Sequence, residues 1–367
     1  MQLSVLVKPA SGLCNMACRY CFYREEMEKR KGSPPSFMDE TTLEHVIRKT
    51  LVNAGDGACF VFQGGEPTLC GLDFFRLAVG LETRYNRKKV PVTNCLQTNG
   101  LLLDDAWCSF LKEHDFLVGL SLDGLRDCHD RCRVAADGGP TFDKVFETAR
   151  RLEKYGVRFN ILTVLNSCTA PLIQDIYRFY RDRGWSFQQY MECLPTAGGT
   201  DAGGQELTLT PEAYGLCMDR LFSLWYRDWK KGRAPYIRQF ENYVGIMLGI
   251  EPEACNQRGS CTIQYVIEAD GSVYPCDFYA EDAYCLGNIN RDRFRDLALG
   301  AAASRFLEES GSLPGACRDC SYAFLCRGGC RRLRISPARQ KNYLCRGLQY
   351  FFDRNLEKIR EISQILS

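Results

Sequence analysis

The sequence predicts an α/β protein with two parts: a partial barrel of six strand-then-helix units, and a smaller cysteine-rich domain after it. Three observations predict this fold class. Short apolar segments alternate with helical patterns over the first two thirds of the chain. Successive β-then-α units make parallel strands joined by right-handed crossovers. From residue 255 onward this alternation stops and cysteines accumulate.

Six segments are predicted to be strands because they are short, apolar and mostly end at turn residues. They are LSVLVKPA, ACFVFQGG, NCLQTNG, FLVGLSLDG, VRFNILTVL and FQQYMECLP. Apolar spacings of three and four predict helices between them, over residues 42–53, 74–85, 104–114 and 142–155. Chemistry in parallel sheets lies beyond the carboxyl ends of the strands. The cysteine loop and the GGEP, TNG and SLDG motifs all follow strands in this way.

Later segments predict a bridge and a second domain. Residues 196–206, TAGGTDAGGQE, are predicted to be a flexible glycine-rich loop, and helices are expected over 211–231 and 236–248. The segment QYVIEADGSVYPCDFY predicts a hairpin with Asp-Gly at its turn, and a helix over 346–365 ends the chain. The expected boundaries are 1–232 for the barrel, 233–254 for a helical bridge and 255–367 for the C-terminal domain.

Composition limits the class of protein. The 367 residues are 45% hydrophobic, and 47 basic against 45 acidic side chains give a net charge of +2. This balance argues against nucleic acid or a membrane surface as a partner bound by charge. No stretch approaches a transmembrane span, and MQLSVLVKPA lacks the features of a signal peptide. The expected location is therefore the cytoplasm.

The 21 cysteines are the outstanding feature of the composition. In a cytosolic protein they indicate metal or redox chemistry more than disulfides. The sequence separates three groups, and no histidine lies near any of them: Cys14, Cys18 and Cys21; Cys255, Cys261 and Cys276; and Cys317, Cys320, Cys326 and Cys330 with Cys345 downstream. Ligation by thiolates alone fits zinc as well as iron–sulfur clusters. The other ten cysteines, such as Cys59, Cys95 and Cys217, are expected to be mostly buried free thiols.

The first group has the spacing CxxxCxxC, with an aromatic residue before the last cysteine. It resembles the signature of radical S-adenosylmethionine (SAM) enzymes. The resemblance implies that three thiolates hold a [4Fe–4S] cluster and leave one iron open for the amino and carboxylate groups of SAM. Reduction would then cleave SAM to a 5′-deoxyadenosyl radical that takes a hydrogen atom from the substrate.

The C-terminal cysteine spacing resembles the SPASM domain, which carries two auxiliary [4Fe–4S] clusters. The resemblance implies two sets of four ligands: Cys255, Cys261, Cys276 and Cys330 for the first cluster, and Cys317, Cys320, Cys326 and Cys345 for the second. With four thiolates each, neither cluster has a corner for SAM. They would serve as electron relays, as folding supports, or as both.

Within this group the chain resembles the anaerobic sulfatase-maturating enzymes, through FQGGEPTL, CLQTNG, FLVGLSLDG, GSVYPCDFY, CRGGCRR and NYLC. The resemblance implies oxidation of a cysteine or serine in an unfolded sulfatase polypeptide to Cα-formylglycine without oxygen. It also implies a reduced flavodoxin- or ferredoxin-type electron donor. Two alternatives stay open: another SPASM enzyme that makes thioether links or epimerised residues in a ribosomal peptide, and a non-catalytic zinc or ferredoxin-like protein.

The same resemblance implies residues that bind SAM. Gly65 would let the backbone approach the amino group of SAM, and the backbone of Tyr20 would meet adenine. Ser121 and Arg133 would bind the ribose and the carboxylate, and Leu194 would pack on adenine. Gly65 could instead belong to an ordinary strand-end turn, and Arg133 could be a solvated surface charge.

Asp277 is the predicted catalytic base. It follows Cys276 directly, and a carboxylate beside an anionic cluster is expected to have a raised pKa. The alternative is a structural carboxylate bonded to a nearby arginine. Tyr23 and Gln63 are expected to point toward the same mouth, either as substrate contacts or as packing residues.

Overall fold

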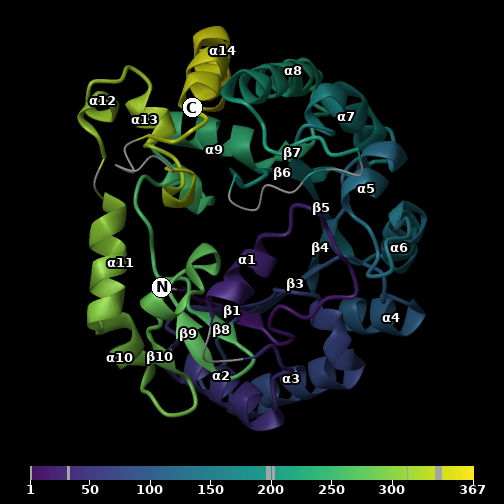
Figure 1. The fold of residues 1–367 in the computed structure, drawn as a ribbon, viewed down its shortest axis with the longest axis vertical. Coiled ribbons are helices and arrows are strands. Elements are labelled where there is room, and N and C mark those ends of the chain that lie inside the picture. The colour runs from purple at the N-terminus through teal and green to yellow at the C-terminus, as the bar shows by residue number, and fades with distance from the viewer. Residues whose placement is uncertain (1, 31–33, 196–199, 201–202, 312, 335–340) are drawn as a thin grey trace. The chain divides into compact units, whose positions relative to one another are not determined.

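The computed structural model describes residues 2–30, 34–195, 200, 203–311, 313–334 and 341–367 (Figure 1). These residues form two compact units. Unit 1 comprises Met1–Leu122, Arg133–Phe159 and Thr262–Leu307, and unit 2 comprises Asp123–Cys132, Asn160–Cys261 and Glu308–Ser367. Each unit is therefore assembled from segments that lie far apart in the sequence. Most of the predicted loop over 196–206 lies outside the described residues.

Unit 1 contains a sheet whose strands follow the order β10-β9-β8-β1-β2-β3-β4. Strands β1 to β4 are parallel to their neighbours, as predicted, and β8 pairs with β1 in parallel. The predicted hairpin is confirmed, because β8 and β9 are antiparallel and β10 continues the pattern. The strands are β1 (Gln2–Lys8), β2 (Gly57–Phe62), β3 (Val92–Thr98), β4 (Leu117–Ser121), β8 (Val266–Glu268), β9 (Ser272–Tyr274) and β10 (Gly287–Asn288).

Several helices of unit 1 begin or end at residues that cap the helix backbone. The carboxylate of Asp39 accepts a hydrogen bond from the Thr42 backbone at the start of α2, and Asp104 does the same for Trp107 at the start of α4. Gly156 ends α6 in the left-handed conformation. The predicted ranges agree with α2 (Glu40–Asn53), α3 (Gly71–Tyr85), α4 (Asp105–Glu113) and α6 (Phe142–Tyr155). The helix α1 (Phe22–Lys29) was not predicted. A further helix of unit 1, α10 (Phe294–Leu299), follows the hairpin.

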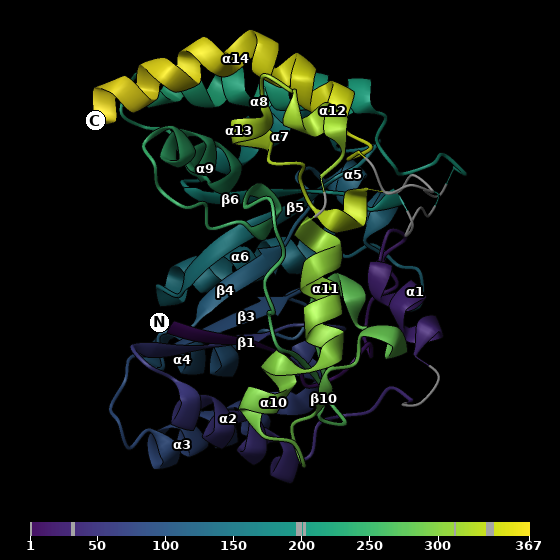
Figure 2. The same ribbon diagram turned by 90° about the vertical axis from the view of Figure 1, so that its left-hand side faces the viewer.

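The core of unit 1 lies between the sheet and these helices. Alternate residues of β2, such as Phe60 and Phe62, are fully buried, and Phe62 packs on Phe75 of α3. Figure 2 shows α2 and α3 together on one side of β1 and β3. Because side chains alternate between the two faces of a strand, the remaining residues of β2 and β3 face the interior of the barrel. The strand ends can therefore present polar groups there.

Unit 2 contains most of β5 (Arg158–Leu165), with β6 (Phe187–Glu192) and β7 (Tyr236–Ile237) in parallel beside it. The prediction of one helix over 236–248 was wrong at its start. Tyr236 donates its backbone N–H to Ser186 and forms β7, so α9 begins only at Arg238. The helices are α5 (Arg126–Cys132), α7 (Ile173–Arg181), α8 (Pro211–Trp229), α9 (Arg238–Met247), α12 (Gly315–Arg318), α13 (Ala323–Cys326) and α14 (Cys345–Leu366); α11 (Ala301–Gly311) begins in unit 1 and ends in unit 2.

The two longest helices of unit 2, α8 and α14, pack on each other along the top of Figure 1. Their backbones approach closely at Gly215 and Gly347, where a Cβ on Gly215 would lie 2.7 Å from the carbonyl oxygen of Gly347. Aromatic side chains fill the interface with α9: Phe222, Trp225, Phe240 and Phe351. Among the described residues, no helix has the length and apolar character needed to cross a membrane.

Candidate active site and cluster cysteines

The loop that carries Cys14, Cys18 and Cys21 follows β1 in unit 1 and is held by backbone hydrogen bonds. Ala17 donates its N–H to the Val134 oxygen at 2.8 Å, and Glu66 donates its N–H to the Leu13 oxygen at 2.8 Å. The segments before Cys14 and before Cys18 are thus anchored to two other parts of unit 1. The loop is therefore a fixed element, and it brings the three thiols to the carboxyl end of β1.

Gly65 of the GGEP motif lies directly against the start of this loop. Its φ is +49°, and a Cβ on this residue would lie 2.2 Å from the Leu13 carbonyl oxygen. A backbone oxygen cannot move aside as a side chain can, so glycine is required here. This close approach explains the glycine, whereas its predicted contact with SAM stays a prediction.

Tyr20 and Arg133 contact each other. The Arg133 guanidinium lies over the Tyr20 ring, 5.4 Å from its centre, and both residues are buried. The alternative that Arg133 is a solvated surface charge is therefore wrong, because only 7% of the residue is exposed. Ser121 accepts a hydrogen bond from Gln97 Nε2 at 3.1 Å. Leu194 belongs to unit 2 and is buried there, so its contact with adenine stays a prediction.

The thiols of the first loop favour the neutral form when no metal is bound. Cys14 is an exposed residue, but partial burial of its sulfur, with contributions from Glu66 and the two other thiols, raises the pKa of the thiol to about 12. Burial also raises the pKa of Cys21. Metal ligation requires thiolates, so a cationic group must supply the missing stabilisation.

The three groups singled out from the sequence consist of cysteines alone, and a [4Fe–4S] cluster is held by cysteine thiolates. Among the described residues, no group of three Cys, His, Asp or Glu side chains is arranged to hold a single metal ion.

The cysteines of unit 2 divide into two neighbourhoods. Burial raises the pKa of Cys330 to about 12, and Cys255 and Cys261 act on it electrostatically. Burial also raises the pKa of Cys326 to about 11, but there the neighbouring thiols are Cys345, Cys317 and Cys320. Cys330 thus lies with the earlier pair although Cys326 is close to it in sequence. The crossed ligand sets implied by the resemblance stay a prediction, and their remaining member, Cys276, belongs to unit 1.

Asp277 begins a 3₁₀ turn, η5 (Asp277–Tyr279), after the hairpin of unit 1, and three side chains surround it. Its Oδ2 accepts hydrogen bonds from Tyr23 Oη at 2.6 Å and from Gln63 Nε2 at 2.7 Å. Its Oδ1 lies 3.7 Å from Lys8 Nζ. The expected convergence of Tyr23 and Gln63 is confirmed, and the cation beside the carboxylate is a lysine, where the structural alternative expected an arginine.

Lys8 links Asp277 to a second buried carboxylate, Glu268 at the end of β8. Lys8 Nζ lies 2.8 Å from Glu268 Oε1, and Arg30 Nη1 lies 2.8 Å from Oε2. Ser11 Oγ donates a further hydrogen bond to Oε2 at 2.7 Å. The four residues Lys8, Glu268, Arg30 and Asp277 are each less than 9% exposed. Two cations and two carboxylates therefore compensate one another in the interior of unit 1.

The surroundings shift the pKa values of the two carboxylates, Asp277 and Glu268, in opposite directions. Burial raises the pKa of Asp277, while Lys8, Tyr23 and Gln63 counteract part of that rise. The predicted direction is confirmed, with burial as its cause in this structure. Burial alone would raise the pKa of Glu268 as well, but Lys8 and Arg30 outweigh it and lower that pKa. Glu268 is therefore the carboxylate of the network that is charged at neutral pH.

Gly64 makes room for the lysine. With φ at +86°, it lies where a Cβ would come within 2.5 Å of Lys8 Cε and 2.6 Å of Lys8 Cγ. The two glycines of GGEP thus make room for two different neighbours. Gly64 leaves space for the side chain of Lys8, and Gly65 leaves space for the cysteine loop. Sequence reasoning missed Lys8 and Glu268 as site residues. The available signal was a charged residue at the end of an otherwise apolar strand, in LSVLVK and YVIE.

The expectation for the other cysteines is mostly confirmed. Six of them are buried: Cys108, Cys128, Cys132, Cys168, Cys193 and Cys217. Cys59, Cys70 and Cys95 are half-buried. Cys285 is exposed, so the expectation of burial was wrong there, because the residue follows the short η6 turn (Asp282–Tyr284) after the hairpin.

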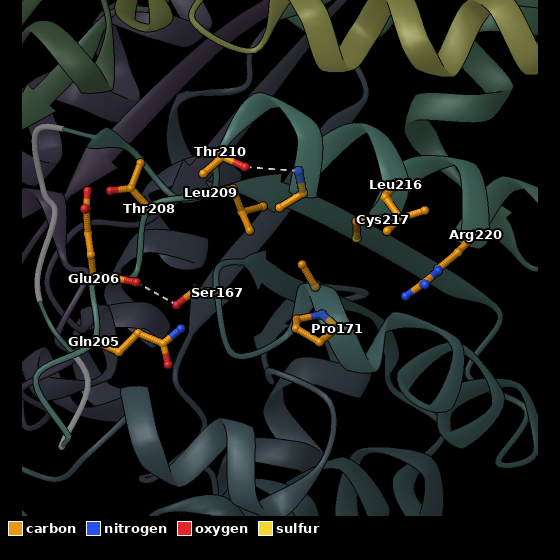
Figure 3. Close-up of a pocket in the computed structure, with 12 residues that line it drawn as sticks. Ser167, Pro171, Gln205, Glu206, Thr208, Leu209, Thr210, Leu216, Cys217 and Arg220 are labelled. Carbon is orange, nitrogen blue, oxygen red and sulfur yellow. Dashed lines mark hydrogen bonds between the residues drawn. The ribbon is translucent and has the colours of Figure 1, made fainter.

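Unit 2 also contains a cavity of about 500 Å³ between the 3₁₀ turn η2 (Ala170–Leu172) and the first turns of α8 (Figure 3). Its walls combine apolar side chains such as Pro171, Leu209 and Leu216 with Arg220. Ser167 Oγ donates to the Glu206 carbonyl at 2.7 Å and closes one side. No predicted site residue is among the described residues that line it.

Comparison with protein families supports both parts of the site. A model of the radical SAM superfamily matches residues 9–179. A model of the SPASM iron-sulfur cluster-binding domain matches residues 255–321. The first covers the cysteine loop and GGEP, and the second covers the hairpin and Asp277. The chemistry predicted from the cysteine spacing is thus the chemistry of the matched families.

Relatives that match nearly the whole chain indicate a more specific family within these two groups. A cysteine-type anaerobic sulfatase-maturating enzyme of Clostridium novyi (strain NT) is 36% identical over 100% of this chain and 98% of its own length. A serine-type anaerobic sulfatase-maturating enzyme of Bacteroides thetaiotaomicron is 31% identical over 95% of this chain and 88% of its own. Among solved structures, native anSMEcpe with bound AdoMet and Cp18Cys peptide has a TM-score of 0.94, with 36% identity and 100% of both chains covered.

Proposed function

The chain belongs to the family of anaerobic sulfatase-maturating enzymes, and we propose that it oxidises a cysteine in an unfolded sulfatase polypeptide to Cα-formylglycine without oxygen. The observation that carries the proposal is the buried Asp277, bonded to Tyr23 and Gln63 in the same unit as the cysteine loop. A hydrogen-abstracting site alone would fit many radical enzymes. A carboxylate with two fixed donors supplies the proton acceptor that oxidation of a thiol needs.

We propose cysteine as the preferred target residue. The cysteine-type relative is 36% identical to this chain and the serine-type relative 31%, over nearly the whole length of both. A solved relative holds a peptide described as Cp18Cys at a TM-score of 0.94. The other candidate reaction, formation of a thioether link or an epimerised residue in a ribosomal peptide, has no comparable support.

Cys14, Cys18 and Cys21 would hold the first [4Fe–4S] cluster, with Gly65, Tyr20, Ser121, Arg133 and Leu194 around SAM. Cys255, Cys261, Cys276 and Cys330 would hold the first auxiliary cluster, and Cys317, Cys320, Cys326 and Cys345 the second. When bound, these groups supply hydrogen-atom abstraction at Cβ and an acceptor for the second electron. The chain itself binds the peptide, holds the target side chain and moves the proton.

Asp277 would take the proton of the target thiol. Its Oδ2 already accepts two hydrogen bonds, so its orientation is fixed before the substrate arrives. Loss of one hydrogen from Cβ, one proton from sulfur and one electron converts the CH₂–SH group to a thioaldehyde. Water then replaces sulfur, which leaves as hydrogen sulfide, and the aldehyde of formylglycine remains. Tyr23 and Gln63 position the carboxylate and meet the substrate at the same place.

The remaining partners follow from this chemistry. We propose that a reduced flavodoxin- or ferredoxin-type protein supplies the electron for SAM cleavage, and that the reaction takes place in the cytoplasm before the sulfatase folds. An unfolded substrate is required because the target residue must reach a carboxylate that is only 6% exposed. Nucleic acid and membrane are not proposed as partners.

The test uses the reconstituted full chain with SAM, a reductant and two peptides of the type C/S-x-P/A-x-R that differ only in cysteine or serine at the target. Mass spectrometry should show replacement of sulfur by a carbonyl oxygen in the cysteine peptide, faster than loss of two hydrogens from the serine peptide. The triple variant Cys14→Ala, Cys18→Ala and Cys21→Ala is the control, and it should keep both auxiliary clusters while losing SAM cleavage. A thioether or an epimerised residue in the product would instead support the alternative reaction.

A further inference from the structure

We propose that Asn99 is a positioning residue for the first cluster. Its side-chain amide donates a hydrogen bond to the Cys14 sulfur and thereby raises the reduction potential of the cluster that Cys14, Cys18 and Cys21 hold. The inference rests on the proposed assignment of these three cysteines as ligands. Asn99 lies in the TNG motif after β3, to which the reaction itself assigns no role.

The geometry places two amide hydrogens in front of two acceptors. Asn99 Nδ2 lies 3.7 Å from Cys14 Sγ, within hydrogen-bonding range for sulfur, and 2.8 Å from Asn15 Oδ1. The orientation of the amide is determined by a third contact, because the Leu101 backbone N–H donates to Asn99 Oδ1 at 3.0 Å. An N–H can only donate, so the oxygen of Asn99 must face Leu101. The NH₂ group therefore faces the cysteine loop.

A buried carboxylate holds Asn99 in this position. Glu66 Oε2 accepts a hydrogen bond from the Asn99 backbone N–H at 2.7 Å, and Oε1 accepts one from Thr98 Oγ1 at 2.7 Å. The Glu66 backbone N–H in turn donates to Leu13, the residue before Cys14. Glu66 is only 1% exposed. Glu66 thus connects the TNG turn to the cysteine loop through its side chain and its backbone, and it fixes the distance between Asn99 and Cys14.

The expected electronic effect has a definite sign. Reduction of a cluster adds negative charge that is partly carried by its thiolate sulfurs, and hydrogen bonds to those sulfurs help to set the potential. A donor stabilises the reduced form more than the oxidised form. Asn99 is 7% exposed, so its amide has little access to water and is held on its protein partners. The only other hydrogen bond to the Cys14 sulfur among the described residues comes from the Met16 backbone N–H at 3.4 Å. Loss of the Asn99 amide should therefore lower the potential.

Two substitutions separate this role from a structural one. Asn99→Ala removes the amide but keeps the backbone N–H that Glu66 needs. Asn99→Asp keeps the size and the oxygen that accepts from Leu101, but it turns an oxygen without hydrogen toward Cys14. If Asn99 only closed the turn, the Ala variant would keep the wild-type potential. The proposed role predicts a lower potential in the Ala variant, and a still lower one in the Asp variant, where a negative charge adds to the loss of the donor.

The measurement is a redox titration followed by electron paramagnetic resonance, on the full chain with all clusters reconstituted. The relevant cluster is identified as the one whose signal changes when SAM is added. The potential should fall from wild type to Ala to Asp, and the rate of SAM cleavage should fall ~10–100-fold, as is typical when a hydrogen-bond partner of a metal ligand is lost. Asn86→Ala is the matched control, because Asn86 also closes a turn, with Val90 at 2.8 and 3.0 Å, at the far end of α3.

The outcomes are distinguishable. A wild-type potential in the Ala variant, or an Asp variant closer to wild type than the Ala variant, overturns the role of Asn99. If the Asp variant fails to load its first cluster, the potential of the Ala variant decides. Absence of any SAM-responsive cluster in the unmodified chain overturns both the ligand assignment and this inference. A normal SAM-responsive cluster with no peptide oxidation would refute only the proposed substrate, and the order of potentials would still test Asn99.

Discussion

Tyr23 donates its hydroxyl hydrogen to Oδ2 of Asp277 at 2.6 Å, although 254 positions separate the two residues in the sequence. Tyr23 lies in α1, directly after the cysteine loop, and Asp277 directly after a predicted cluster ligand of the hairpin. The bond therefore joins the segments that the radical SAM and SPASM models match, within one unit. The proposed base is thus held in a fixed orientation by a residue of the radical SAM segment.

Asp277→Asn should separate SAM cleavage from product formation. The substitution keeps the shape of the side chain but removes the proton acceptor, so formylglycine should fall by ~10²–10⁴. Formation of 5′-deoxyadenosine should persist, because the carboxylate takes no part in cleaving SAM. Both products are measured in one assay. The exposed neighbour Asp282 offers the control Asp282→Asn. Near-wild-type aldehyde from the Asp277 variant would exclude this residue as the base, and Tyr23 would be the next candidate.

Cys330→Ala and Cys326→Ala should damage different clusters, although the two residues lie four positions apart. Cys330 is surrounded by Cys255 and Cys261, whereas Cys326 is surrounded by Cys317, Cys320 and Cys345. Each variant should lose up to about four of about twelve irons. The spectrum of the remaining auxiliary cluster should differ between them. Identical spectra from both variants would contradict the crossed ligand sets.

Glu268→Gln should destabilise unit 1 in a pH-dependent way. Removing one partner of a buried ion pair typically costs ~3–5 kcal/mol, because Lys8 and Arg30 would lose their shared carboxylate. The pKa of Glu268 is lowered in the folded state. Its stabilisation is therefore present above the unfolded pKa of about 4.3 and is lost as the pH falls through the lower folded value.

The thermal midpoints of wild type and Glu268→Gln should thus differ most near pH 7 and start to converge below about pH 4, as the pH falls toward the lower folded pKa. The exposed Glu113 at the end of α4 supplies the control Glu113→Gln, which should melt as wild type at every pH. A difference that stays constant down to acid pH would show that Glu268 contributes by packing and not by its charge.

Gly65→Ala should disrupt the cysteine loop. The new Cβ would overlap the Leu13 carbonyl oxygen, and the left-handed backbone adds strain. Iron content should fall by about four per chain while the auxiliary clusters remain. Gly80→Ala in the exposed interior of α3 is the matched control, because its Cβ would meet nothing within 4 Å. That variant should be more stable by ~0.4–1 kcal/mol. Full iron content in the Gly65 variant would be evidence against this packing argument.

Local patterns predicted most of the fold and part of the site. Strands β1 to β6 were predicted because each is a short apolar run that ends near turn residues, and α6 because its apolar spacing and Gly156 agree. The convergence of Tyr23, Gln63 and Asp277 was expected from the family resemblance and the carboxyl ends of the strands. Such features are encoded within a few residues of where they act.

The missed features depend on long-range pairing. Lys8 and Glu268 meet only because β8 pairs with β1, and no pattern in either segment specifies which edge the hairpin joins. The mostly polar segment FYREEMEK carries little signal for α1. The short strand β7 exists only through its pairing with β6, and the role of Asn99 depends on Glu66, which is distant in sequence. These contacts follow from the tertiary structure alone.

The pairing of β8 with β1 has a consequence for synthesis of the chain. β1 leaves the ribosome well before β8, whose Val266 pairs with Leu6. Until β8 follows, one edge of β1 has no strand beside it, and Lys8 has neither of its carboxylates. The sheet of unit 1 should therefore be completed only after β8 has been synthesised. A shortened gene that ends before the hairpin should give an aggregating product in place of an independent radical SAM domain.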